Sequence, residues 1–112
     1  MSLQEENGWT PLIMTVLFGS RDDLTMKLLK KLLDLGSDPY KVSKIGYSVI
    51  HLSANLGFFM YIKEFVSWDL NFNKFTEPAN EIPKTSLHLA IQFNKARVVS
   101  ELIKSDTIDL FI

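Results

Sequence analysis

The sequence predicts an all-α fold made of three stacked helix-turn-helix units joined by extended loops. Three short stretches begin with a hydroxyl residue followed by mostly apolar residues, at Thr10, Ser48 and Thr85. A hydroxyl residue suits the N-cap, because its side chain can accept a hydrogen bond from an amide of the first turn. Each stretch is followed by a glycine or asparagine and then by a second apolar helical pattern. A two-helix unit that recurs at nearly equal spacing predicts a repeat protein whose units stack into one core.

The first unit is expected to begin with Thr10 at the N-cap and Pro11 at the first helical position. Proline is tolerated there because the amide that it lacks would have no partner within the helix. The pattern predicts a first helix over 12–18. Gly19 is expected to end this helix in the left-handed conformation that glycine adopts without strain.

A second helix is predicted over 24–35, where leucines recur at spacings of three and four residues and form an apolar stripe. Asp22 and Asp23 come just before it, and negative charge is favoured at the start of a helix. Gly36 is expected to end the helix. An extended loop over 37–45 follows, since it contains an Asp-Pro turn signal.

The second unit repeats this arrangement. Its first helix is predicted over 49–55, and Gly57 is expected to end it as Gly19 ends the first. Its second helix is predicted over 58–68. The apolar face of that second helix is expected to contain Met60, Ile62, Phe65 and Val66.

The third unit follows a long connector over 69–84, in which two prolines predict a loop rather than a helix. The unit begins at Thr85, and its two helices are expected within 85–94 and 95–104. Asn94 stands where the earlier units have glycine, and asparagine is the next most tolerant residue of left-handed angles.

These units resemble the ankyrin repeat family, whose pattern is Gly-x-Thr-Pro-Leu-His-x-Ala-Ala-x-x-Gly before a leucine-rich helix and a Gly-Ala-Asp-x-Asn exit. The matching residues are Gly8, Thr10, Pro11, Leu12, Gly19, Leu32, Leu33, Gly36 and Asp38 in the first unit, Gly46, Ser48, Val49 or Ile50, His51, Ala54, Gly57 and Asn71 in the second, and Thr85, Leu87, His88, Ala90, Asn94, Val98, Leu102 and Ile103 in the third.

The resemblance implies one domain over residues 1–112, an ankyrin-type solenoid with repeats at about 7–40, 45–72 and 82–109 and with extended finger loops between them. Two departures are visible. The spacing between units exceeds the family's period of about 33 residues, and Ile13 stands where the family has histidine. The residues to which the resemblance assigns a structural role in the turns are Thr10, Ser48, His51, Thr85 and His88.

Composition excludes several classes of function. The net charge of −1 provides no overall field that would attract nucleic acid or an anionic membrane. The absence of cysteine excludes disulfides and thiolate metal sites, and it fits an intracellular, cytoplasmic location. No apolar run reaches the roughly 20 residues that a membrane-spanning helix needs, and the polar residues 1–7 do not resemble a signal peptide.

No catalytic, cofactor or metal site is predicted. The only histidines, His51 and His88, lack further ligands at metal-binding spacing, and no nucleophile motif, carboxylate pair or glycine-rich phosphate loop is present. In the ankyrin family this histidine forms hydrogen bonds between neighbouring turns, so the resemblance implies a structural role. The lysines of 27–31 are interpreted as a solvated helix face, with an acidic partner as the alternative.

An apolar residue directly precedes the turn in all three units, at Phe18, Leu56 and Phe93. In the ankyrin family this position lies near the exposed inner surface, so the resemblance implies a row that binds a partner through large apolar anchors. The alternative is that the row packs between the units as core. A second candidate surface is formed by the loop aromatics Tyr40, Tyr47, Phe72 and Phe75.

The predicted function is therefore that of a non-enzymatic scaffold that binds another protein through its inner helical face and finger loops. A regulatory or substrate-recruiting fragment of a larger enzyme or pathogen effector, the latter acting in the host cytoplasm, is the alternative. The apolar residues 110–112 favour self-association or adjoining repeats at the C-terminal face. An ordinary helical bundle is a third interpretation, in which the repetition would be coincidental.

Overall fold

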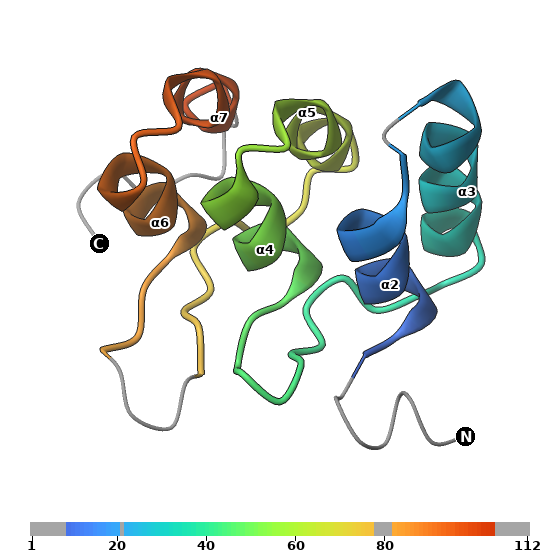
Figure 1. Ribbon diagram of the computed structural model, residues 1–112, viewed down its shortest axis with the longest axis horizontal. Helices are drawn as coiled ribbons and strands as arrows, with labels where there is room; N and C mark the ends of the chain where they lie inside the picture. Colours follow the sequence, from blue (N-terminus) through green and yellow to red (C-terminus); the bar gives the residue numbers. More distant parts are fainter. Residues whose placement is uncertain (1–8, 21, 78–81, 105–112) are drawn as a thin grey trace.

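A computed structural model of the chain describes residues 9–20, 22–77 and 82–104 (Figure 1). Within these ranges the structure has six helices and no strand, which confirms the predicted all-α class. Each helix begins and ends within two residues of its predicted bounds. The helices are α2 (Pro11–Phe18), α3 (Asp23–Asp34), α4 (Val49–Leu56), α5 (Phe59–Ser67), α6 (Ser86–Gln92) and α7 (Ala96–Leu102).

The helices form two layers, with α2, α4 and α6 in one and α3, α5 and α7 in the other (Figure 1). The two helices of each consecutive pair pack against each other. In addition, α4 lies between α2 and α6, and α5 packs against α7. The described parts of the two long loops extend below the layer of α2, α4 and α6 in Figure 1. Three helix pairs therefore stand in a row, with both loops on one side.

Local capping explains where the first helices begin. Thr10 accepts a hydrogen bond from the Ile13 amide through its side-chain oxygen at 3.1 Å, and Thr85 accepts one from the His88 amide at 3.3 Å. Asp22 begins α3 in the same way, accepting from the backbone amide and the hydroxyl of Thr25, both at 2.9 Å. The backbone bond is the main reason why the pKa of Asp22 lies below its ordinary value.

The turns after the helices divide into two kinds. Gly57 and Asn94 have φ angles of 78° and 57°, so the predicted left-handed conformation is confirmed at these two positions, and Gly36 also has a positive φ, of 93°. The prediction for Gly19 is wrong, because this residue is extended, with φ −69° and ψ 155°. Glycine is needed there for space: a Cβ atom would lie 2.6 Å from the Thr15 carbonyl oxygen and would overlap the Thr25 methyl group.

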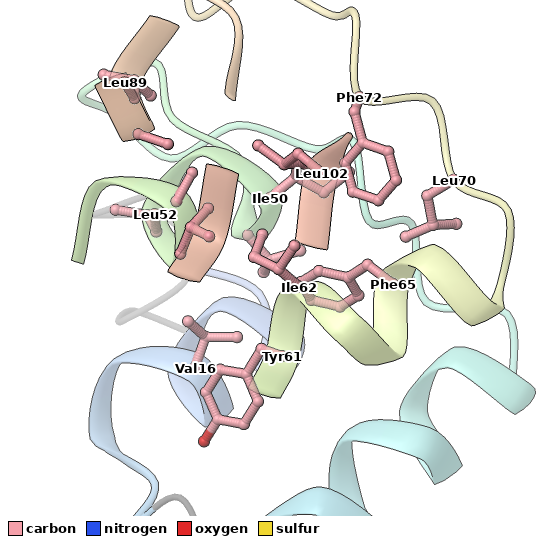
Figure 2. Packing of buried hydrophobic residues seen from close by; sticks show 14 of the residues in the cluster. Val16, Ile50, Leu52, Tyr61, Ile62, Phe65, Leu70, Phe72, Leu89 and Leu102 are labelled. Carbon is pink, nitrogen blue, oxygen red and sulfur yellow. The ribbon is translucent and has the colours of Figure 1, made fainter. Parts of the chain in front are cut away.

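One hydrophobic core runs through the row of helix pairs, between the two layers (Figure 2). Its largest fully buried side chains are Tyr61 and Phe65 of α5 and Phe72 of the following loop. Figure 2 shows Val16 of α2 beside Tyr61, so the core joins the first pair to the second. At the other end Val98 and Leu102 of α7 are fully buried, and the core extends into the third pair. The core is therefore built both within each helix pair and between neighbouring pairs.

Candidate functional site: an exposed apolar row and the Gly57 groove

The row that precedes the turns is exposed. Phe18 is 66% exposed, Leu56 43% and Phe93 45%, so the interpretation of this row as core is wrong. Phe18 and Leu56 are the last residues of α2 and α4, and Phe93 is the C-cap of α6. These residues therefore stand at the C-terminal ends of three adjacent helices of one layer (Figure 1). Burial of such side chains by a partner would remove a large apolar area from water.

A groove begins directly after Leu56, where the second unit turns from α4 into α5. One hollow of about 220 Å³ is lined by Gly57, Phe58, Phe59, Met60 and Tyr61. An adjoining hollow of about 430 Å³ shares Gly57 and Phe59 with the first and reaches the third unit, where it is lined by Lys95, Ala96, Arg97 and Val98. We call these two hollows together the Gly57 groove.

Met60 belongs to this groove and not to the core. The prediction that Met60 lies on the apolar face of α5 is wrong, because its side chain is 49% exposed. Tyr61, Ile62 and Phe65 fill the core, and Met60 lies about 200° around the helix from Ile62. Phe58 and Phe59 are partly buried and pack against the core. The signal in the sequence is the run Leu56-Gly57-Phe58-Phe59-Met60, which holds more apolar residues than a single helix face can bury.

Two basic side chains are held against the walls of the groove. The stem of Lys95 passes so close to Gly57 that a Cβ atom there would lie 2.9 Å from the Lys95 Cδ atom. The guanidinium carbon of Arg97 lies 4.9 Å from the centre of the Phe59 ring, a cation–π arrangement. These residues come from α7 and the turn before it, whereas Gly57 and Phe59 come from the previous unit. The larger hollow of the groove was not predicted from the sequence, because its walls come from two different units.

The loop aromatics are mainly structural. Phe72 is 1% exposed and belongs to the core, so its prediction as a partner-binding residue is wrong. Tyr40 is half-buried, and its hydroxyl accepts a hydrogen bond from the Asn71 amide at 2.8 Å, which ties the first loop to the second. Tyr47 is half-buried and lies edge-on to the His51 ring at 6.2 Å. Phe75, at 47% exposed, is the aromatic that the second loop presents to solvent.

The two histidines occupy equivalent places in α4 and α6. The Nδ1 atoms of His51 and His88 each accept a hydrogen bond from the N-cap amide of their helix, from Ser48 and Thr85, both at 3.2 Å. His51 is also within 2.8 Å of the Lys74 carbonyl oxygen through Nε2. Burial lowers the pKa of His51, although its contact with that carbonyl and the charge of Glu77 act in the opposite direction.

Ser48 and His51 form a pair of a kind that can be catalytic, since a serine beside a histidine can be a nucleophile and its base. The Ser48 hydroxyl lies 3.0 Å from the Nδ1 atom of His51. Ser48 is only 2% exposed, however, and Nδ1 already accepts from the Ser48 backbone amide. A hollow of about 260 Å³ reaches Ser48 and His51, but the backbone amide occupies the Nδ1 lone pair that a base would need. We therefore assign the pair to capping of α4. Within the described ranges no cluster of three histidine or acidic side chains could hold a metal ion.

The lysine face of α3 is solvated. Lys27, Lys30 and Lys31 are exposed, and Lys30 lies 3.7 Å from Glu64 of α5 in an ion pair whose lysine side is open to water. Such a pair contributes little to stability. In the part of the chain that the structure describes, no helix has the length and apolar character that crossing a lipid bilayer requires. The apolar segment 110–112, on which the predicted self-association depends, lies outside the described residues.

Comparison with known proteins provides no relative: no protein-family profile, no curated protein and no solved structure matches this chain. The case for a function therefore depends on the geometry of the chain itself. The most extensive feature of that geometry is the exposed row Phe18, Leu56 and Phe93 together with the Gly57 groove.

Proposed function

We propose that the chain is an ankyrin-type solenoid of three repeats that binds another protein through the exposed row and the Gly57 groove, without catalysing a reaction. The proposal on the fold is supported by the row of three helix pairs, by the left-handed turn residues Gly57 and Asn94, and by the equivalent capping contacts of His51 and His88. We further propose that it acts inside the cell, in the cytoplasm, where a chain without cysteine needs no disulfide.

The observation that carries the proposed binding function is the exposure of large apolar side chains at equivalent positions. Exposed apolar residues are common singly, but large ones that recur at equivalent positions mark a candidate interaction site. Here Phe18, Leu56 and Phe93 are joined by Met60, which is also about half exposed. The row also requires little rearrangement before binding, because its residues end helices that the core holds in place.

A capture experiment tests this function. The wild-type chain and the triple variant Phe18→Ala/Leu56→Ala/Phe93→Ala would be used to isolate partners from the source cell, with thermal melting recorded for both. We expect the variant to lose its partner while its melting temperature changes little, because the side chains removed are exposed. A fall of several degrees in the melting temperature would mean that the row supports the fold instead.

The matched control is Leu28→Ala/Leu35→Ala, which removes two exposed leucines from α3 and the turn after it. We expect this control to retain the partner. If the control loses the partner as readily as the triple variant, or if neither variant loses it, the row and the groove are not the binding surface.

A further inference from the structure

The Gly57 groove combines apolar walls with charge of one sign. Phe58, Phe59 and Met60 provide large apolar side chains. Among the described residues that line the groove, the charged side chains are Lys95 and Arg97, and both are basic. The chain as a whole carries a net charge of −1, so this local excess of positive charge is not a consequence of overall composition.

Both cations are positioned before any partner binds. The stem of Lys95 lies across Gly57, whose lack of a side chain and φ of 78° leave the space that it occupies. Arg97 lies over the Phe59 ring at 4.9 Å. Long basic side chains lose conformational entropy when a partner orders them, and this loss is smaller where packing already restricts them.

From this combination we infer that the groove binds a protein segment in which carboxylate side chains stand beside large apolar ones. The apolar anchors would fill the hollows beside Met60 and Phe59, and the carboxylates would pair with Lys95 and Arg97. A neutral or basic segment in the same position would remove water from the two cations and would supply no carboxylate in its place. This loss of hydration opposes binding. This inference depends on the proposed binding function and specifies the chemistry of the partner.

The test is a selection of short random peptides displayed on phage, with the purified full chain as the target. We expect the wild-type chain to enrich Asp and Glu next to Leu, Phe or Trp. The variant Lys95→Glu/Arg97→Glu should lose this preference and enrich Lys and Arg instead, since its groove carries the opposite charge. Circular dichroism would confirm that the variant is folded.

The variant Lys27→Glu/Lys31→Glu is the control, because it makes the same change in net charge on the exposed face of α3, away from the groove. Its enriched peptides should match those of the wild-type chain. If wild-type peptides show no acidic preference, or if the control alters the selection as much as the groove variant does, the inference is wrong. If no peptide is enriched by any target, the proposed binding function itself fails.

A synthetic peptide of the enriched sequence and its Asp→Asn, Glu→Gln counterpart provide the quantitative test by titration calorimetry. We expect the amide counterpart to bind about tenfold more weakly, the loss expected for a hydrogen bond to a charged group. The affinity of the acidic peptide should also fall as salt is added, because exposed ion pairs are screened. Equal affinities of the two peptides at low salt would overturn the inference.

Discussion

The Nε2 atom of His51 lies 2.8 Å from the carbonyl oxygen of Lys74, a contact that joins α4 to the loop after α5. On the other side of the ring, Nδ1 accepts a hydrogen bond from the Ser48 amide. This pair of contacts assigns the neutral tautomer with its hydrogen on Nε2, which donates to Lys74. The residue is 2% exposed, so a second proton would have to be buried, and it would remove the acceptor that Ser48 uses.

We therefore predict a loss of stability as the pH falls through the ordinary titration range of histidine. Burial lowers the pKa of His51 in the folded chain below 6.5, its ordinary value and that of the unfolded chain. The unfolded chain then binds more protons at mildly acidic pH, so the free energy of unfolding is largest above about pH 6.5 and decreases as the pH falls toward the folded pKa. Urea midpoints measured between about pH 7.5 and 5.5 check this.

The matched variant is His51→Gln, which cannot gain a proton in this range. We expect this variant to be less stable at neutral pH by about 1–3 kcal/mol, because the glutamine amide can reproduce only part of the hydrogen bonding of the buried imidazole. Its midpoint should change less with pH than that of the wild-type chain. An equally steep pH dependence in His51→Gln would show that another group is responsible.

Two buried serines allow a second prediction with a built-in control. Ser53 of α4 and Ser86 of α6 are both 0% exposed. The Ser53 hydroxyl has no hydrogen-bond partner among the described residues, whereas the Ser86 hydroxyl donates to the Phe72 carbonyl oxygen at 3.0 Å. We expect Ser53→Ala to stabilise the chain by up to about 1 kcal/mol and Ser86→Ala to destabilise it by about 1–2 kcal/mol. Chemical denaturation of both variants measures the difference, and changes of the same sign would contradict the prediction.

Features that depend on nearby residues could be predicted from the sequence. The caps at Thr10 and Thr85 and the left-handed turns at Gly57 and Asn94 follow from residue type and spacing, and the structure has them where they were expected. The helix bounds also agree closely, since each helix combines a capping residue, an apolar period and a turn residue. These signals operate within a few residues of chain.

Features that depend on distant residues could not be predicted in this way. Phe72 follows a helix and precedes a proline-containing loop, so its sequence context indicates exposure, yet the loop turns it into the core. Met60 lies outside because it is about 200° around α5 from Ile62, on the side that holds Lys63 and Glu64. The Gly57 groove needs Lys95 and Arg97 from another unit, a proximity that no local pattern contains.

The two glycines that end helices of the first unit should respond differently to alanine. Gly36 has φ 93°, and a Cβ atom there would have no heavy atom within 4 Å, so Gly36→Ala adds only backbone strain, about 1 kcal/mol. Gly19 has an ordinary φ, but a Cβ atom would lie 2.6 Å from the Thr15 carbonyl oxygen. Backbone must move to relieve that contact, and we expect Gly19→Ala to cost about 1–3 kcal/mol.

Urea denaturation of the two glycine variants separates strain from crowding. Asn94→Gly provides the control, since Asn94 has φ 57° and glycine adopts that angle without strain. It should be neutral or slightly stabilising. If the Gly19→Ala variant is as stable as the wild-type chain, Thr15 and Thr25 do not lie close enough to Gly19 to exclude a side chain there.

The two phenylalanines of the loop after α5 differ in burial. Phe72 is 1% exposed and Phe75 is 47% exposed, although only three positions separate them. Figure 2 shows the Phe72 ring pointing from the loop into the cluster that contains Phe65 and Leu102. Removing such a ring typically costs about 3–5 kcal/mol, a large part of the stability of a small domain.

We therefore expect Phe72→Ala to be largely unfolded or to melt far below the wild-type temperature, while Phe75→Ala melts close to it. Because an unfolded variant supplies no free energy, Phe72→Leu is the quantitative counterpart: it keeps part of the buried volume and should cost about 1–2 kcal/mol. Circular dichroism melts of the three variants provide the comparison. If Phe72→Ala has the same melting temperature as the wild-type chain, the loop does not complete the core. The second and third units must then be held together by α4, α5, α6 and α7 alone.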